Sequence, residues 1–204
     1  SSAASDVYKR QEKMKSLFIE KEIKYIGSQL APHWIYKNFH ILGDAVVSFI
    51  GEMDVKITEM VDIEDVISDS PIYSKKMVSF IIEQFGISLS ECVVRQRFLM
   101  CIIIEELRKI VGDKFKIRRN GDDIFVNIDG VDKKLSVSIA TQSITSCLIH
   151  TGLNIDPTGA PVDACGLTTD LGITDVETFA KNVMKRYIEE DTEISEATCK
   201  VRGV

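Results

Sequence analysis

Long apolar runs, regularly spaced cysteines and clustered histidines are all missing from this chain. The longest apolar stretch, Phe98 to Ile104, is far shorter than the roughly 20 residues that a membrane-spanning helix needs, so we predict no membrane partner. The five cysteines are odd in number and irregularly spaced, which argues against a disulfide framework. The three histidines show no metal-ligand spacing, so we predict no zinc site.

An excess of positive charge is also missing. The net charge of −6 argues against non-specific binding to nucleic acid. The amino-terminal residues do not have the charged-then-apolar form of a signal peptide. With no disulfide framework expected, these features predict a reduced, cytoplasmic protein.

The first residues form a polar tail with an unusual sequence. Asp-Val-Tyr-Lys-Arg-Gln, residues 6–11, back-translates to GATGTGTATAAGAGACAG, which is similar to the end of a transposon adapter used in DNA library preparation. We expect residues 1–11 to be a non-native, disordered tail, with the true start near Met14. A natural polar tail would be equally disordered. The length of the remainder fits one domain over residues 12–204.

Apolar periodicity predicts an α+β fold, with helices flanking a mainly antiparallel central sheet. Helices are predicted from Pro32 through Phe39, and over Ser74–Gln84, Ser90–Val111 and Asp175–Glu190. Strands are predicted over Leu17–Ile19 and Ile23–Ile26 as a hairpin, and over Ala45–Gly51, Val55–Met60, Phe115–Ile117, Ile124–Ile128, Leu135–Ala140 and Ser146–His150, with Ala197–Val201 at an edge. Val61–Val66 is predicted as an acidic connection, and Asp129-Gly130 as a hairpin turn. The apolar helix over Ser90–Val111 is also a candidate surface for a homodimer.

Charged and polar residues gather at strand ends in the second half of the chain. Cations and acids beside a strand-end lysine predict a site for a carboxylate or phosphate ligand. The candidate ligand-binding residues here are Arg118, Arg119, Asn120, Gly121, Asp122, Asp123, Lys133, Lys134, Ser136, Ser138, His150, Gly152 and Asn154. Farther upstream, His33 and Trp34 either line a pocket for a planar ligand or pack in the core.

The order of these motifs resembles that in the biotin and lipoate protein ligases. Arg119-Asn120-Gly121-Asp122-Asp123 stands where those enzymes have Lys-Trp-Pro-Asn-Asp. Lys133-Lys134-Leu135-Ser136 is similar to Arg/Lys-Lys-Leu-Ala-Gly, and Gly152-Leu153-Asn154 is similar to Gly-(Leu/Ile)-Asn. The resemblance covers about residues 118–167 and implies a biotin/lipoate ligase-like, class II synthetase-like fold.

A second resemblance covers nearly everything after Met14. The segments at 33–39, 60–65, 121–124, 134–141 and 200–202 look like those of an uncharacterised, mainly archaeal family, domain of unknown function 366. That family is similar in fold to the ligases, and its activity is not established.

The ligase resemblance implies specific roles and the cofactors ATP and Mg²⁺. Lys134 would contact the substrate carboxylate and the α-phosphate as an acyl-adenylate forms. Arg118 and Arg119 would hold phosphate or carboxylate oxygens, Asp122 or Asp123 would bind Mg²⁺ or a substrate amine, and Asn154 would order its strand end. Two departures oppose the use of ATP: the glycine- and arginine-rich loop of biotin ligases is not found, and Val137 replaces a glycine.

A third likeness offers a different chemistry. Octanoyltransferases use a cysteine in a Pro-Cys-Gly-Ile/Leu setting with a lysine upstream, and Ala164-Cys165-Gly166-Leu167 follows Lys134 at a similar spacing. Cys165 is therefore a candidate nucleophile beside Lys134, although a buried thiol is the simpler interpretation. The leading hypothesis is an ATP-dependent ligase or acyltransferase that acts on a small carboxylate or nucleotide ligand. The alternatives are a non-catalytic binding protein and an ATP-independent cysteine/lysine acyltransferase.

Overall fold

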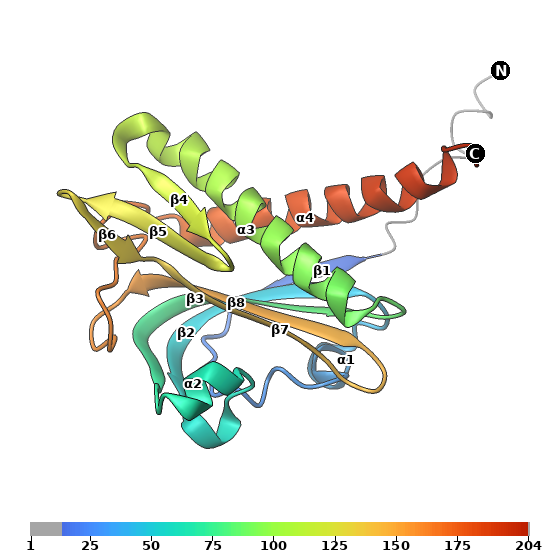
Figure 1. The fold of residues 1–204 in the computed structure, drawn as a ribbon, viewed down its shortest axis with the longest axis horizontal. Helices are drawn as coiled ribbons and strands as arrows, with labels where there is room; N and C mark the ends of the chain where they lie inside the picture. Colours follow the sequence, from blue (N-terminus) through green and yellow to red (C-terminus); the bar gives the residue numbers. More distant parts are fainter. Residues whose placement is uncertain (1–13, 204) are drawn as a thin grey trace.

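The computed structural model describes residues 14–203, and the tail predicted over residues 1–11 lies outside them. The described residues form two sheets and their covering helices (Figure 1). The larger sheet has the strand order β1-β2-β3-β8-β7, and the smaller has the order β4-β5-β6. The elements are β1 (Lys15–Ile19), α1 (Trp34–Phe39), β2 (Ala45–Val55), η1 (Ile57–Glu59), α2 (Ile63–Ile67), β3 (Ile72–Gln84), α3 (Leu89–Val111), η2 (Gly112–Lys114), β4 (Ile117–Asn120), β5 (Asp123–Ile128), β6 (Val131–Lys134), β7 (Ser136–Gln142), β8 (Cys147–Asp156) and α4 (Val176–Cys199).

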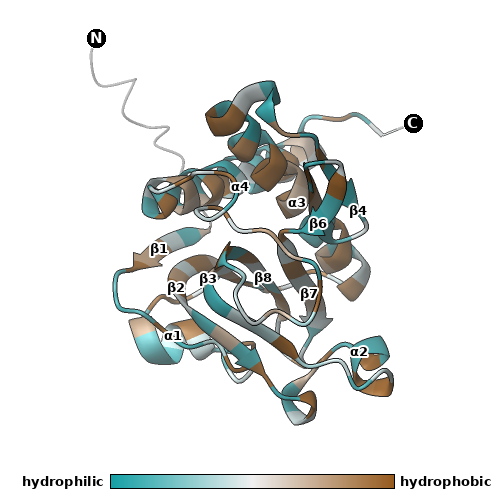
Figure 2. Cartoon of the chain, turned by 90° about the vertical axis from the view of Figure 1, so that its left-hand side faces the viewer, coloured by the Kyte–Doolittle hydropathy of each residue, from teal (hydrophilic) through white to brown (hydrophobic). Residues whose placement is uncertain are grey.

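The larger sheet is mainly antiparallel, as the sequence predicts. Among its strand pairs within the described residues, β1–β2 runs parallel, and β2–β3, β3–β8 and β8–β7 are antiparallel. Helices α3 and α4 cover one face, and α1 and α2 lie on the other (Figure 2). This arrangement is the predicted α+β fold with helices flanking a central sheet.

Strand β3 lies in the middle of the larger sheet and is buried on both faces. Successive side chains of a strand point to opposite faces, so each face of β3 packs into a different core. Val78 and Phe80 join the core beneath α3 and α4. Met77 and Ile81 join a second core with Ile35 of α1.

The helix predicted over Ser74–Gln84 is therefore wrong, because these residues lie in β3. A short apolar run that is buried on both faces fits a central strand and a buried helix equally well, and periodicity alone does not separate the two. The β-branched and aromatic residues of this run favour the strand once neighbours pair with it on both sides.

Four other local predictions are wrong for a related reason. Residues 17–26 do not form a hairpin, because β1 pairs in parallel with β2 and Tyr25 bridges separately to Met53. Residues 57–59 form the short helix η1 instead of a strand, and the acidic connection contains helix α2. The expected edge strand near residue 197 belongs to α4, which continues to Cys199. The structure of each of these four segments depends on contacts with distant residues or on the length of a helix. Local sequence patterns specify both poorly.

The predictions that rest on long periodic segments or on turn residues agree with the structure. Helices α1, α3 and α4 and strands β2, β5, β7 and β8 lie where they were expected, with shifted ends. Asp129 and Gly130 connect β5 to β6 with φ angles of 51° and 87°, which confirms the predicted hairpin turn. The apolar side of α3 packs against the larger sheet and α4. The homodimer stays a prediction.

A buried polar cluster joins β3 to both long helices. The side chain of Asp191 on α4 accepts hydrogen bonds from Arg95 of α3 and from Gln84 at the end of β3. The hydroxyl of Tyr187 donates to Gln84 Oε1 at 2.8 Å. Because buried polar groups are stable only when they are hydrogen-bonded, this cluster fixes the position of α4 over the sheet. None of the helices within residues 14–203 has the length and apolarity needed to cross a membrane.

Gly51 allows another chain segment to cross β2 at close range. The strand has an irregular register between Gly51 and Met53, and there the backbone of Ile23 donates to Ile50. A Cβ at position 51 would overlap the carbonyl oxygen of Ile23 and lie 2.6 Å from its carbonyl carbon. The crossing segment leads to Tyr25, so the glycine determines where that ring can lie.

We predict that Gly51→Ala lowers the free energy of unfolding by about 2 kcal/mol or more, because the added methyl overlaps backbone that cannot move aside cheaply. Gly203→Ala is the matched control, since a Cβ at position 203 meets no other atom within 4 Å. Urea denaturation of both variants measures the effect. Equal stability of the two variants would contradict the close approach.

Candidate functional site

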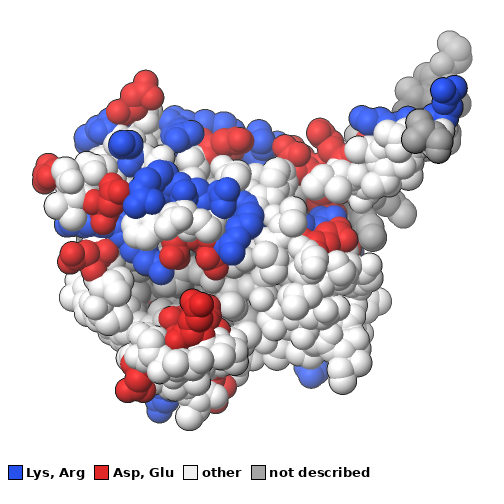
Figure 3. All heavy atoms as spheres, viewed as in Figure 1, with Lys and Arg blue, Asp and Glu red and all other residues white. Residues whose placement is uncertain are grey.

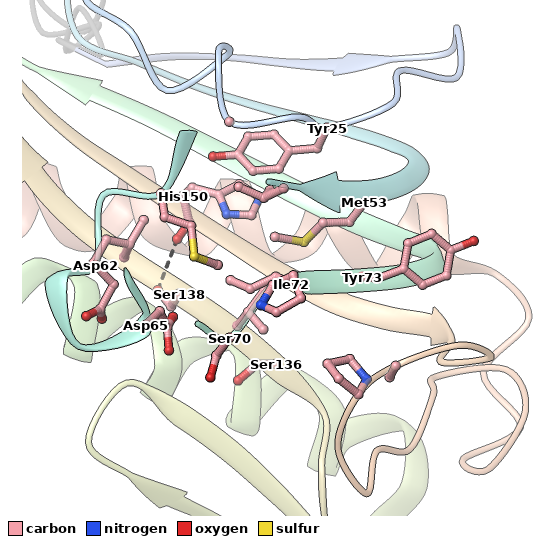
Figure 4. Close-up of a pocket in the computed structure, with 18 of the residues that line it drawn as sticks. Tyr25, Met53, Asp62, Asp65, Ser70, Ile72, Tyr73, Ser136, Ser138 and His150 are labelled. Atoms are coloured by element: carbon pink, nitrogen blue, oxygen red, sulfur yellow. Dashed lines mark hydrogen bonds between the residues drawn. The ribbon is translucent and has the colours of Figure 1, made fainter. Parts of the chain in front are cut away.

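A cavity of about 530 Å³ lies where α2 and its flanking loops face β7 and the junction of the two sheets. Its wall combines residues from β2, β3, β7 and β8 with loops that are distant in sequence (Figure 4). The molecular surface in Figure 3 shows acidic side chains over the α2 region, across from basic side chains over the smaller sheet. A cavity of this size suits a small organic ligand.

Lys134 and Asp123 form an ion pair at the cavity wall. The ammonium lies 3.0 Å from Asp123 Oδ1, and the two side chains are 30% and 27% exposed. The backbone of Lys134 is held on both sides, because its N–H donates to Asp163 and its carbonyl accepts from Cys165. Burial raises the pKa of the Asp123 carboxyl, while the hydrogen bond from Lys134 lowers it. An anionic ligand could therefore compete with Asp123 for a positioned ammonium.

Asp122 is held from the other side by helix α3. Arg97 Nη1 lies 2.7 Å from Asp122 Oδ1, and Gln96 donates to Asp122 Oδ2 at 3.1 Å. Gln96 also donates to the hydroxyl of Ser138, which shares a hydrogen bond with Thr151. Sequence reasoning missed Gln96 and Arg97, because they lie within a long helix and no motif marks them.

A stacked aromatic pair forms another part of the wall. The rings of Tyr25 and His150 lie 3.8 Å apart between centroids and are inclined by 5°. His150 is 2% exposed, and its Nε2 shares a hydrogen bond of 3.2 Å with Ser79. Burial lowers the pKa of His150 to about 3, so the imidazole is neutral near pH 7. Sequence reasoning identified His150 but missed Tyr25, which follows an irregular segment without a motif.

Helix α2 and its N-cap place two acids toward the cavity and the isoleucines toward solvent. Asp62 and Asp65 are half-buried in the lining, whereas Ile63 and Ile67 are largely exposed. The carboxylate of Asp62 caps the helix by accepting from the backbone N–H of Glu64. Burial raises the pKa of Asp65, and repulsion from Asp62 adds to this effect.

The structure brings about half of the predicted site residues together. Those that line the cavity are Asp122, Asp123, Lys134, Ser136, Ser138, His150 and Asn154. Asn154 donates to the carbonyl of Lys134 at 3.4 Å, and its backbone N–H donates to Leu135. Asn154 thus connects the end of β8 to the strand that carries the lysine.

The other predicted residues lie outside the lining of this cavity: His33, Trp34, Arg118, Arg119, Asn120, Gly121, Lys133, Gly152 and Cys165. Arg118 pairs with Asp132 at 2.8 Å and lies over the ring of Phe125. Arg119 donates to the carbonyl of Gly121. The two arginines are consecutive in β4 and point to opposite faces of the strand, and each is engaged by a partner in the smaller sheet or its turn.

The upstream pair His33 and Trp34 belongs to the start of α1. The ring of Trp34 packs against Phe39 and Phe49, which favours core packing over a planar-ligand pocket. The backbone N–H of His33 donates to Glu83 at 2.8 Å.

Cys165 is fully buried beside the lysine strand. Its thiol points to the carbonyl of Lys133, and burial raises its pKa to about 12. Because the thiolate is the nucleophile, a buried thiol with a raised pKa does not suit acyl transfer. The simpler interpretation, a structural thiol, agrees with this geometry.

We predict that native protein reacts rapidly with iodoacetamide at Cys101 and Cys199, which are exposed, and slowly at Cys165, which is buried. Mass spectrometry of the alkylated protein at neutral pH measures each site separately. Unfolding in urea should make all five cysteines reactive. Rapid labelling of Cys165 in the folded protein would restore it as a candidate nucleophile.

We predict that His150 makes the protein less stable in acid. The folded-state pKa of about 3 lies below the ordinary value of 6.5, so the unfolded chain takes up a proton that the folded protein excludes. The stabilisation from neutral His150 is fully present above pH 6.5 and is lost as the pH falls toward about 3.

Urea unfolding at about pH 7 and about pH 5 measures this loss. His150→Gln should reduce stability at the higher pH but lose less on acidification than the wild type. His40→Asn, which changes an exposed histidine with a φ of 57° that asparagine tolerates, should lose as much stability on acidification as the wild type. An unchanged loss in His150→Gln would show that other groups cause it.

Comparisons with known proteins identify two proteins that are similar over most of this chain. The chain is 39% identical to a protein of unknown function from Pyrococcus horikoshi, with a TM-score of 0.84 over 94% of this chain and 99% of that one. It is 34% identical to the uncharacterized protein MJ0805 of Methanocaldococcus jannaschii, over 88% of this chain and 80% of that one.

The fold is also that of the biotin and lipoate protein ligases. The biotin protein ligase of Aquifex aeolicus in complex with biotin and ATP has 14% identity and a TM-score of 0.55, over 88% of this chain and 70% of the ligase. A lipoate protein ligase of Thermoplasma acidophilum has 11% identity and a TM-score of 0.50, over 89% and 83%. At such identities the likeness concerns the fold alone.

One family description matches nearly the whole of the described chain. The match covers residues 14–202. The chain therefore belongs to the family called Domain of unknown function (DUF366).

Proposed function

We propose that this protein binds a small organic carboxylate in the cavity beside Lys134, as a ligase or acyltransferase of the biotin/lipoate ligase fold. The observation that carries the proposal is the position of the Lys134 ammonium at the wall of a ligand-sized cavity. Its backbone is fixed by hydrogen bonds to Asp163 and Cys165, so the charge is held in place before a ligand arrives.

A bound carboxylate would share the Lys134 ammonium with Asp123. The ammonium has three N–H donors, so it can keep its contact with Asp123 at 3.0 Å while it donates to a ligand carboxylate. Asn154 and Ser136 line the same region and offer neutral hydrogen-bonding groups beside the lysine. These groups suit the binding and orientation of one carboxylate.

The ligase fold adds support of a general kind. The Aquifex aeolicus ligase was solved in complex with biotin and ATP, so a protein of this fold binds a small carboxylate and a nucleotide. We carry over the ligand class and leave the identity of the carboxylate open.

ATP fits the cavity poorly. Among the described residues that line it, Lys134 is the single lysine or arginine, and seven carboxylates accompany it. A bare triphosphate would be repelled by these acids. Arg97 lies behind Asp122 and is already paired with it. We therefore derive no step through ATP.

The oxygen atoms at this site are of the type that Mg²⁺ prefers, but they are not arranged as a complete metal site. Asp122 and Asp123 supply the oxygen ligands that Mg²⁺ prefers, and one or two carboxylates with waters are sufficient. Within residues 14–203, however, no three histidine, cysteine or acidic side chains gather closely enough to hold a metal ion. Bound Mg²⁺ would neutralise charge on a phosphate or on these acids.

A non-catalytic binding protein is the second candidate. It is favoured by the buried thiol of Cys165 and by the poor fit to a triphosphate, because both weaken the known routes to acyl transfer on this fold. This candidate shares the carboxylate site and differs only in turnover.

We predict that a small carboxylate raises the melting temperature of the wild-type protein but not of Lys134→Ala. Octanoate, lipoate, biotin and ATP·Mg²⁺ are tested in parallel by thermal shift. A ligand at a hundred times its dissociation constant stabilises the folded state by about 2.7 kcal/mol, which is readily measured. Lys185→Ala, which removes an exposed lysine on α4, is the control and should respond as the wild type.

Two results would sink the proposal: no shift with any carboxylate, or an equal shift in Lys134→Ala. A second measurement separates the two candidates. Carboxylate-dependent release of AMP, or transfer of the acyl group to an acceptor, identifies an enzyme. Binding without either reaction identifies a binding protein.

A further inference from the structure

The charges of the cavity do not balance for a simple carboxylate ligand. Of the seven lining carboxylates, Asp122 is paired with Arg97 and Asp123 with Lys134. The remaining five form no ion pair within residues 14–203: Glu59, Asp62, Glu64, Asp65 and Asp69. Glu59, Glu64 and Asp69 are exposed to solvent, so a ligand with only negative charge would be repelled mainly by the half-buried Asp62 and Asp65.

The acids do not converge as metal ligands do. They are distributed along η1, helix α2 and the loop before β3, and among the described side chains no group of three is close enough to hold a metal ion. A compact divalent cation needs its oxygen ligands at about 2.0–2.6 Å. Spread carboxylates around a cavity of about 530 Å³ better suit an organic ligand that carries an ammonium group.

The hydroxyl of Tyr25 provides an independent sign of a ligand. Tyr25 is 4% exposed and lines the cavity, yet its hydroxyl makes no hydrogen bond to any part of the chain between residues 14 and 203. In Figure 4 this hydroxyl points to the side of the cavity where Asp62 and Asp65 lie. The ring is buried while the hydroxyl is accessible and without a partner among the described residues, so it can hydrogen-bond a polar group of a ligand in the cavity.

We infer that the ligand of this cavity is an aminocarboxylate, whose protonated amine binds Asp62 and Asp65 near the Tyr25 hydroxyl while its carboxylate binds Lys134. The inference rests on the proposed function and narrows its substrate class. An ammonium donates up to three hydrogen bonds, so it can reach two carboxylates and a phenolic oxygen together. Neutral His150, stacked on Tyr25, adds no competing positive charge.

The ligand would also stabilise the lining itself. Burial raises the pKa of Asp65, and repulsion from Asp62, Asp123 and Glu64 adds to this effect, while attraction from Lys134 opposes it. An ammonium among these carboxylates relieves that repulsion, whereas a second carboxylate increases it. An amine on the ligand therefore explains how a cavity with so few cations can belong to a carboxylate-binding protein.

Isothermal titration with matched ligands tests the inference on the full chain. The probes are octanoate, 8-aminooctanoate and MgCl₂, which separate the carboxylate, the added amine and the metal. We expect 8-aminooctanoate to bind about tenfold more tightly than octanoate, as a charge-assisted hydrogen bond would give. The double variant Asp62→Asn/Asp65→Asn should remove this advantage and leave octanoate binding unchanged or tighter.

The variants are chosen so that folding is preserved. Asparagine caps helices as well as aspartate does, so Asp62→Asn retains the start of α2. Tyr25→Phe keeps the stacked ring and should lose part of the amine advantage. Glu189→Gln removes an exposed acid on α4 and should leave the advantage intact.

The titrations distinguish a failure of the amine site from a failure of the proposed function. If octanoate binds as tightly as 8-aminooctanoate, the amine site is overturned and the proposed function stands. If neither binds, both fail. If Mg²⁺ alone binds and only the double variant loses it, the acids form a metal site and the aminocarboxylate is overturned.

Discussion

Burial of β3 on both faces is the constraint on which the rest of the structure depends. A strand with apolar side chains on each face needs a layer above and a layer below, and here α3 and α4 supply one while α1 and the segment before it supply the other. Polar atoms inside must also be paired. Ser79 is matched by His150, and Gln84 by Tyr187 and Asp191. The strand thus fixes the positions of both helices and of the ring that lines the cavity.

The cavity occupies the part of the lower layer that is not filled with apolar side chains. On that side the cover is helix α2, where Asp65 and the N-cap Asp62 are half-buried while the isoleucines are in solvent, the reverse of an ordinary surface helix. Hydrophobic burial therefore contributes little to its position. The site combines a wall built on strands and the Lys134–Asp123 pair with a short helical cover whose described hydrogen bonds join residues of its own segment. Such a combination suits a binding site that must open to admit its ligand.

Sequence reasoning succeeded where a feature is local. The helical spacing of apolar residues in α3 and the residue types of the Asp129-Gly130 turn are local properties of the sequence, and both elements were predicted. Lys134, Asp123 and Asn154 were found because strand ends meet at sheet junctions. Strand β3 was mistaken for a helix because its apolar run fits both structures until its partners are known. Tyr25 and Arg97 were missed because each reaches the site through a tertiary crossing or a helix face, which no motif records.

Gly51 influences the shape of the cavity without being one of the residues that line it. It lies outside the lining, yet it permits the crossing of Ile23 that carries Tyr25 to the ring of His150. A change at the crossing would move the phenol without altering any residue that contacts a ligand. Divergence of ligand preference between homologues could therefore begin at the crossing while every lining side chain stays identical. A comparison of binding residues alone would miss it.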